Sequence, residues 1–456
     1  MNTHNKLSRR DAIKVMGTLS ASVLLSTSAQ ATTKLSQPAS HKKVKIVIAG
    51  GGTGAMIAAA RLRRSAHNAH ITLIAPNKTH LYQSGQTFVA AGLYLQEDNE
   101  RETAEILEDR VQWLQESIIA FDPKNNSLKT DKSGMISYDY LVVALGVEYD
   151  YEAVKGLNKD LIGKDGIASV YMNDTLHGTA TGGTTTNQWF KDIHKSAVKK
   201  KTKVLCTEPQ TPIKGVGTSL DILFLGNDIM KGNGSFSKHN VVNNVNFSFA
   251  KPDNTLFPFA KFNAVIEQKI KNEKNITPLY EYQLQAVDVK KKIATFLTNG
   301  KKVDIAYDFL HVVPPMKPPK VFRDSPLAFK DGKYQGYMNV DTRTLRHNEY
   351  KNVFGLGDIL GIPLGKTGGS AQEQAVIIQD NVAAALENKQ LPMQYNGYTV
   401  SPIKMKFGEI LLAEFNNEKV LPTFWVDPYE PRWIWWELDL HVMRKAYYSL
   451  MMRGML

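Results

Sequence analysis

A glycine-rich segment that follows directly on an apolar run gives the first chemical signal in this chain. The segment 50–55 (GGGTGA) comes immediately after the β-branched run 43–49 (KVKIVIA), and residues 56–64 have a helical composition. Glycines allow a tight turn and let the backbone approach a pyrophosphate, while the free N–H groups of the next helix face the phosphates. The pattern predicts a dinucleotide-binding turn, whose candidate binding residues are Gly50, Gly52, Thr53, Gly54 and Ala55.

The second strand of this unit lacks the acidic residue that usually binds the adenosine ribose. The run 71–74 leads into Ala75, at a place where such units carry Asp or Glu. Asn77 could supply part of the missing contact. Lys78 could bind a 2′-phosphate and so indicate NADP, although a solvated loop lysine is the ordinary interpretation.

Length and composition predict a folded protein of roughly two to three domains, at about 100–200 residues each. The chain has 456 residues, of which 43% are hydrophobic, and a formal net charge of +12. Its basic residues are scattered, which favours an anionic membrane surface or an acidic partner over nucleic acid. The single cysteine, Cys206, excludes an intrachain disulfide and a thiolate metal cage. No metal site is therefore predicted, and redox chemistry needs a bound group.

Residues 1–31 have the order of an export signal of the twin-arginine type. A basic head contains Arg9 and Arg10, the apolar run 15–25 follows, and an A-x-A site ends at Ala31. The alternative is a frayed N-terminal helix with two chance arginines. The signal predicts a periplasmic mature chain, 32–456, at the outer face of the cytoplasmic membrane. The route resembles one used by proteins that fold and bind a cofactor before export.

Seven further segments resemble those of the sulfide:quinone oxidoreductases, flavoproteins of the pyridine nucleotide-disulfide oxidoreductase superfamily that are related to flavocytochrome c sulfide dehydrogenase. They are 79–83 (THLYQ), 138–146 (YDYLVVALG), 211–214 (TPIK), 310–316 (LHVVPPM), 352–358 (NVFGLGD), 366–367 (KT) and 395–398 (YNGY). Several are shared by all related flavin disulfide reductases, whereas 310–316, 366–367 and the C-terminal tail narrow the resemblance to the sulfide branch. The resemblance covers nearly the whole mature sequence and implies FAD as the cofactor.

The resemblance also implies an α/β fold with two Rossmann-like dinucleotide-binding domains of the glutathione reductase type and a C-terminal amphipathic helical tail. The expected divisions are an FAD-binding domain at 44–155 and 291–390, a second domain at 156–290 and a membrane and quinone region at 391–456. In the second domain, Pro209 and Pro212 occupy a turn that NADH would need rich in glycine. NADH is therefore not an expected substrate. A Gly/Thr stretch at 178–186 looks like a flexible surface insertion.

For the flavin itself, the resemblance implies roles for Asp358 and Lys366. Asp358 would accept hydrogen bonds from the ribityl chain, and Lys366 would lie near the flavin and the quinone and stabilise the anionic reduced ring. Without the resemblance, Asp358 would be interpreted as a helix N-cap and Lys366 as a solvated loop lysine. The predicted FAD contacts outside the glycine turn are Asn77, Gln83, Ile118, Ala144, Gly146, Gly357, Asp358 and Lys366.

The chain departs from the sulfide branch where its members carry two redox cysteines beside the flavin. In that branch, sulfide opens the disulfide of the pair, and the corresponding positions here are Gly215 and Ser401. A hydroxyl cannot shuttle electrons through a disulfide, so the usual relay is absent. Cys206 is ordinarily interpreted as an inert buried residue, with a flavin-proximal nucleophile as the alternative. The candidate catalytic residues are Lys366, Glu208 and Cys206, with His311 as a further candidate for proton transfer.

The last residues predict an amphipathic helix at a membrane surface. Apolar side chains recur at helical spacing from Trp433 to Met451, charged ones project from another side, and Asp439 interrupts the pattern. Too many charges occur for a helix that crosses a membrane. A helix packed on the protein's own core is the alternative. The resemblance favours contact with the membrane, where the family's tail reaches quinone.

The sequence thus predicts an exported FAD-dependent oxidoreductase that passes electrons from sulfide, a polysulfide or another small reduced donor to membrane quinone. One alternative is a flavin subunit that reduces a partner cytochrome. Its haem would lie on another polypeptide, because the chain has no C-x-x-C-H motif. Another alternative is a non-catalytic paralogue that binds FAD. The sequence also leaves a homo-oligomer open.

Overall fold

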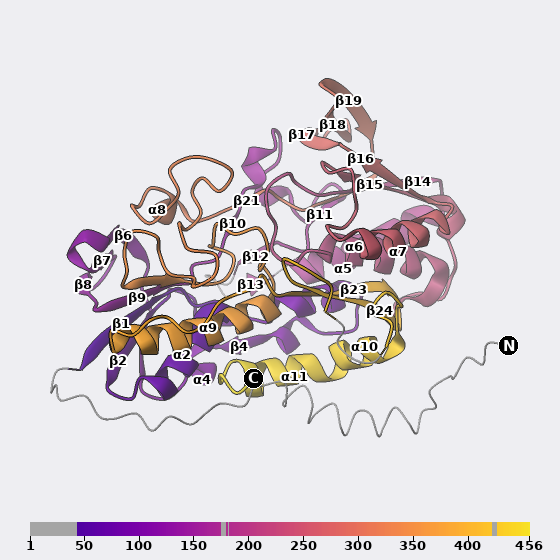
Figure 1. Cartoon of the computed structure of the whole chain (residues 1–456). Helices are drawn as coiled ribbons and strands as arrows, with labels where there is room; N and C mark the ends of the chain where they lie inside the picture. The colour runs from indigo at the N-terminus through magenta and orange to yellow at the C-terminus, as the bar shows by residue number, and fades with distance from the viewer. Residues whose placement is uncertain (1–42, 175–178, 181, 422–425) are drawn as a thin grey trace. The chain divides into compact units, whose positions relative to one another are not determined.

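The computed structural model describes residues 43–174, 179–180, 182–421 and 426–456 (Figure 1). The described residues between Val44 and Met455 belong to one unit. The export signal predicted at 1–31 lies outside the described residues. Two five-stranded parallel sheets form the framework of the unit. This architecture confirms the predicted α/β fold with two Rossmann-like domains.

The first sheet has the strand order β22-β9-β1-β2-β5. The bounds are β1 (Val44–Ala49), β2 (Ala69–Ile74), β5 (Val111–Leu114), β9 (Tyr140–Val143) and β22 (Val353–Gly355). The strands are rich in β-branched residues and mostly buried, as in other parallel sheets that are covered on both faces. Helix α2 (Thr53–Ser65) packs on β1 and β2, and α9 (Gly368–Leu386) packs on α2 (Figure 1). Strand, glycine turn and helix therefore follow one another as predicted.

The second sheet has the order β11-β20-β14-β15-β16. The bounds are β11 (Ile167–Ala168), β14 (Thr202–Thr207), β15 (Val245–Lys251), β16 (Ile276–Tyr280) and β20 (Phe309–Val312). Because β20 pairs with β14, the second domain extends to residue 312 and the boundary predicted at 290 is wrong. The antiparallel sheet β17-β18-β19 lies between β16 and β20 in the sequence and returns the chain to the parallel sheet.

Shorter elements complete the framework. The strands are β3 (Thr79–Leu81), β4 (Glu100–Glu102), β6 (Ile118–Asp122), β7 (Ser127–Thr130), β8 (Gly134–Ser137), β10 (Glu148–Tyr149), β12 (Asn173–Asp174), β13 (Thr179–Ala180), β17 (Gln283–Asp288), β18 (Ile293–Thr298), β19 (Lys301–Ala306) and β21 (Met316–Lys317). The helices are α3 (Gln86–Ala90), α4 (Thr103–Ile106), α5 (Gly182–Ala197), α6 (Thr218–Asp228), α7 (Ala260–Lys271) and α8 (Lys320–Arg323).

The Gly/Thr stretch predicted as a flexible insertion begins helix α5, which is buried on one face, in its described part. Helix α5 packs against α3. A Cβ on Gly183 would lie 2.7 Å from the Cβ of Val89 and 2.9 Å from the carbonyl oxygen of Gln86. The glycine therefore allows two helices to approach closely, which is a packing role and not a sign of flexibility.

The C-terminal region combines a hairpin with a helical tail. Strands β23 (Thr399–Lys406) and β24 (Glu409–Phe415) form the hairpin. The tail, residues 433–451, includes α10 (Trp433–Leu438) and α11 (Arg444–Ala446) and is yellow in Figure 1. Within the described ranges, no helix is long and apolar enough to cross a membrane.

The tail's apolar stripe is divided between the protein and the solvent. Trp436, Tyr447 and Met451 are buried, whereas Trp433 and Met443 are exposed. The buried members of the stripe pack on the folded unit, as in the alternative interpretation of the tail, whereas the exposed members face solvent.

Candidate functional site

Gly50 allows three strand ends of the first sheet to meet at one point. It has a φ of +126°, and a Cβ there would lie 2.3 Å from the carbonyl oxygen of Ala144, which follows β9. A Cβ on Gly54 would lie 3.2 Å from Cδ1 of Leu356, which follows β22. The glycine turn, the segment after β9 and the segment after β22 therefore form a single region, as the sequence predicted for the FAD site.

Glycines around this region border open space. A Cβ placed on Gly52, Gly146 or Gly357 would meet no atom within 4 Å. Gly52 precedes α2, so the unpaired N–H groups of that helix begin beside the open space. A dinucleotide phosphate needs backbone donors with no side chain in the way, and this region provides them. The predicted roles of these three glycines fit the structure.

Asp358 provides a carboxylate next to the open region. It follows Gly357 and is half-buried, and it has no hydrogen bond or ion pair with another side chain in the part of the chain that the structure describes. A partly buried carboxylate that accepts no hydrogen bond from the described residues is stabilised when a ligand donates to it. The hydroxyls of a ribityl chain are suitable donors, so Asp358 also fits FAD.

Lys366 is a buried cation and not the solvated loop lysine of the alternative interpretation. Its Nζ donates to the carbonyl oxygens of Asp358 at 2.7 Å and Leu360 at 2.8 Å, and it lies 4.6 Å from the ring centre of Tyr337. Burial lowers the pKa of Lys366 to about 8, while the nearby Asp358 carboxylate raises it. This ammonium can offset negative charge that develops on a bound group.

For three other predicted FAD contacts, the structure gives less evidence of a position beside the open region. The Oδ1 atom of Asn77 would lie 4.0 Å from a Cβ on Gly51, so Asn77 borders the turn. Gln83 is exposed, and Ile118 is buried at the start of β6. Their contacts with FAD stay predictions.

The surroundings of Cys206 and Glu208 do not favour the catalytic roles suggested for them. Cys206 is buried in β14, and burial raises the pKa of its thiol to about 12, so the thiolate needed for attack is absent near neutral pH. Glu208 forms a buried ion pair with Lys251 at 3.1 Å and accepts a hydrogen bond from Ser219. Both are therefore structural groups.

His311 is also a poor candidate for proton transfer. Its Nε2 accepts a hydrogen bond from the backbone N–H of Val170 at 3.0 Å, and burial lowers its pKa to about 3. A histidine that stays neutral throughout the physiological range does not exchange protons easily.

The segment 215–217 contacts both Lys366 and Ser401, the second position expected to have lost a cysteine. The N–H of Gly215 donates to the carbonyl oxygen of Lys366 at 2.8 Å. The hydroxyl of Ser401 donates to the carbonyl oxygen of Val216, and a Cβ on Gly217 would lie 2.8 Å from that hydroxyl oxygen. The segment 215–217 and Ser401 are thus brought together, and neither carries sulfur.

One residue of the region, His80, received no role from the sequence. His80 lies within hydrogen-bond distance of the Gly51 carbonyl at 3.3 Å and of the Tyr447 hydroxyl at 2.6 Å. His80 belongs to a segment that resembles the family, but spacing gives no sign that it meets a tyrosine 367 positions away.

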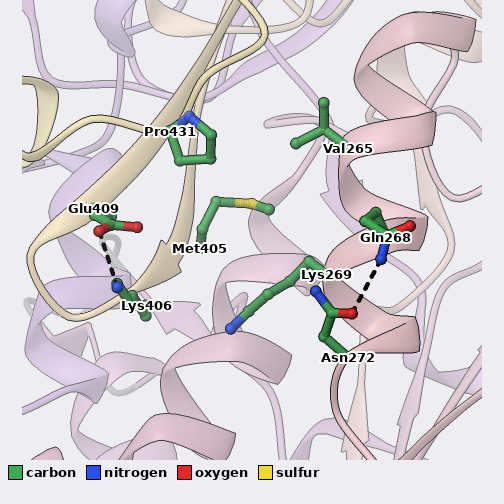
Figure 2. A pocket seen from close by; sticks show the side chains of 8 residues that line it. All are labelled: Val265, Gln268, Lys269, Asn272, Met405, Lys406, Glu409 and Pro431. Carbon is green, nitrogen blue, oxygen red and sulfur yellow. Dashed lines mark hydrogen bonds and ion pairs between the residues drawn. The ribbon is translucent and has the colours of Figure 1, made fainter. Parts of the chain in front are cut away.

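A pocket on another part of the surface has no connection with these residues. The pocket has a volume of about 310 Å³. Figure 2 shows its lining side chains, which come from α7 and the β23-β24 hairpin and the segments next to them. Its lining includes the ion pair between Lys406 and Glu409, at 2.9 Å. None of its lining residues belongs to the glycine turn or to the region around Lys366.

Comparison with known proteins agrees with this geometry. The family model of the pyridine nucleotide-disulphide oxidoreductases matches residues 44–172. The chain is 32% identical to the mitochondrial sulfide:quinone oxidoreductase of Dictyostelium discoideum over 412 residues, which covers 90% of this chain and 86% of the relative.

Solved structures show the same fold at lower identity. The sulfide:quinone oxidoreductase of Aquifex aeolicus superposes with a TM-score of 0.71 at 18% identity, over 89% of this chain and 90% of that one. A chain in the mitochondrial ATP synthase structure of Tetrahymena thermophila gives 0.74 at 17% identity, over 92% and 98%. With its FAD-binding framework kept and both redox cysteines replaced, this chain is an FAD-dependent oxidoreductase and belongs to the sulfide:quinone oxidoreductase family.

Proposed function

We propose that this protein passes two electrons from a small reduced donor, sulfide or a polysulfide, through FAD to membrane quinone without a cysteine relay. One observation carries the proposal: the residues expected to bind FAD are kept, whereas the two cysteines that would react with the electron donor are replaced. Gly52, Gly357 and Lys366 keep the features that FAD needs, while Gly215 and Ser401 leave no sulfur beside Lys366.

The chain's own residues have separable roles in this proposal. Bound FAD would supply the two-electron chemistry between the donor and the quinone. The N–H groups at the start of α2 bind its phosphates, and Asp358 accepts hydrogen bonds from its hydroxyls. Lys366 holds a positive charge in a place with little water, where that charge stabilises a reduced ring more than it would in bulk solvent.

The exposed side of the tail supports the proposed contact with a membrane surface. Trp433, Val442 and Met443 are 41%, 41% and 42% exposed. Lys445 is exposed on the same helical segment. Exposed tryptophan and basic groups suit the headgroup layer of an anionic membrane. We place this membrane at the periplasmic face, in keeping with the export signal proposed for residues 1–31.

The loss of the relay also favours a second candidate, a non-catalytic paralogue that binds FAD. A third candidate is a flavin subunit that gives its electrons to a partner cytochrome, whose haem would lie on another polypeptide. The reduction of quinone in the purified protein separates these possibilities from the main proposal.

In a cell lysate, the protein is expected to sediment with membranes. After purification from that membrane fraction, it is expected to be yellow. Anaerobic addition of sulfide or polysulfide should bleach the flavin absorbance, and decyl-ubiquinone should restore it. A flavin that sulfur donors cannot reduce would contradict the donor. Reduced flavin that reacts with a cytochrome c and not with quinone would contradict the acceptor.

Restoring both cysteines is expected to restore a disulfide. In the double variant Gly215→Cys and Ser401→Cys, denatured protein should titrate as one thiol before reduction and three after it, because Cys206 is the only native thiol. The φ of +69° at Gly215 disfavours a side chain by about 1–2 kcal/mol. A Cβ there would lie 2.8 Å from Oγ1 of Thr218, a side-chain hydroxyl that can rotate away, so the variant should fold.

The single variant Ser401→Cys is the matched control and should titrate as two thiols before and after reduction. Three thiols in the unreduced double variant would contradict the assignment of these two positions to the lost pair. The native wild-type protein should react with thiol reagents only after unfolding, since Cys206 is buried.

A further inference from the structure

A chain of hydrogen bonds joins the C-terminal tail to the glycine turn. The hydroxyl of Tyr447 lies 2.7 Å from Oγ1 of Thr53, the first residue of α2, and 2.6 Å from Nε2 of His80. The Nδ1 atom of His80 lies 3.3 Å from the carbonyl oxygen of Gly51. Tyr447 and His80 are both buried. These contacts link residues from the two ends of the described chain.

The protonation state of His80 determines which group donates in each of these hydrogen bonds. Burial lowers the pKa of His80 to about 4, so the ring is neutral at physiological pH. Thr53 then donates to Tyr447, Tyr447 donates to Nε2 of His80, and the Nδ1–H of His80 donates to the Gly51 carbonyl. Each of the three side chains donates one hydrogen bond, and the last acceptor is the backbone carbonyl of Gly51 in the glycine turn.

The last bond of this chain fixes the orientation of one peptide group. The structure has no cis peptide among its described residues, so the Gly51 carbonyl and the Gly52 N–H point in opposite directions. Because the carbonyl points towards His80, the Gly52 N–H points away from it. Gly52 is also the residue whose missing side chain leaves open space. An N–H donor beside such space suits a phosphate oxygen.

The rest of the tail is packed firmly enough to hold Tyr447 in place. The ring of Tyr447 lies 4.7 Å from that of Tyr82, and the hydroxyl of Tyr448 donates to the carbonyl oxygen of Asn99 at 2.5 Å. Near the chain end, Arg64 of α2 donates to the carbonyl oxygen of Gly454 at 3.2 Å. The tail and the residues that follow it therefore contact α2 near both ends of that helix.

We propose that the helical tail is a clamp on the FAD-binding turn, in which Tyr447 and His80 are positioning residues that orient the Gly52 N–H towards the FAD pyrophosphate. Docking of the tail thereby strengthens FAD binding and slows FAD release. The proposal rests on the binding of FAD and is independent of the electron donor and acceptor.

The test compares the two adjacent tyrosines of the tail. Tyr447→Phe keeps the ring and removes the hydroxyl that joins Thr53 and His80. Tyr448→Phe, the matched control, removes a hydroxyl that contacts Asn99 and not the turn. FAD release from the purified full chain is followed by the rise in flavin fluorescence after dilution. Release should be about tenfold faster in Tyr447→Phe, which corresponds to the loss of roughly one hydrogen bond, and within about twofold of wild type in Tyr448→Phe.

Variants of His80 keep the proposal testable if Tyr447→Phe fails to fold. The amide of asparagine can replace the Nδ1–H of histidine, whereas leucine cannot donate. His80→Asn should therefore release FAD more slowly than His80→Leu. Equal release rates in these two variants, or in the two tyrosine variants, would overturn the clamp. A wild-type protein without FAD would instead overturn the proposed function.

Discussion

Gly50→Ala is expected to produce a protein that neither binds FAD nor folds stably. The new Cβ would lie 2.3 Å from the carbonyl oxygen and 2.7 Å from the carbonyl carbon of Ala144. Both are backbone atoms, and they cannot move aside because β1 pairs with β9 through Ala49 and Val143. The φ of +126° adds further strain for any residue with a side chain. We expect a loss of more than about 4 kcal/mol in the free energy of unfolding.

Gly52→Ala is the matched control two residues further along the same turn. A Cβ there meets no atom within 4 Å, and the φ of −79° suits any residue. Its unfolding temperature without cofactor should therefore stay close to the wild-type value. Its flavin content should fall sharply, because the methyl group takes space that the phosphates need. Thermal unfolding and the ratio of flavin to protein absorbance measure both effects. Wild-type flavin content in Gly52→Ala would contradict the placement of the phosphates.

The part of the site that depends on local sequence could be predicted well. The glycine turn, β1 and α2 lie within one short segment, and each has a strong local pattern. Ala144 was predicted as an FAD contact, and the structure places its carbonyl oxygen next to Gly50. The positions of the lost cysteines came from the resemblance, and the structure brings them together.

Contacts between distant segments could not be predicted, since nothing in their spacing identifies the partner. Tyr447 was interpreted as one member of an apolar stripe, although its hydroxyl reaches His80 and Thr53. Gly183 suggested flexibility, because the same residue type serves loops and close helix contacts alike. Asp439 looked like an interruption of the stripe. The structure shows instead that Asp439 forms a buried ion pair with a lysine on β23.

That partner, Lys404, is the subject of the second large prediction. The Nζ of Lys404 lies 3.1 Å from Oδ2 of Asp221 on α6 and 3.2 Å from Oδ2 of Asp439 on the tail, and 4.6 Å from the ring centre of Phe88. All three charged groups are buried. One ammonium therefore neutralises two carboxylates from different elements, and it joins the hairpin, α6 and the tail.

Lys404→Met is expected to lower the free energy of unfolding by about 3–5 kcal/mol at neutral pH, because two carboxylates would stay buried without their cation. Burial already raises the pKa of Asp221 above its usual value, while Lys404 opposes that shift. Removing the ammonium raises it further, so the folded variant binds protons that the unfolded chain has released. Its stability should therefore recover as the pH falls, and the difference from wild type should be smaller at pH 5.5 than at pH 7.5.

Lys406→Met provides the control on the same strand, because Lys406 is exposed and its ion pair with Glu409 is open to solvent. An exposed pair contributes at most about 1 kcal/mol, so this variant should unfold close to wild type at both pH values. Urea unfolding followed by tryptophan fluorescence compares the two lysines directly, since the tail itself carries Trp433 and Trp436. If Lys404→Met matched Lys406→Met, the tail would be held by its apolar contacts alone. A large loss that did not diminish towards pH 5.5 would show that packing around the lysine stem, and not its charge, stabilises the junction.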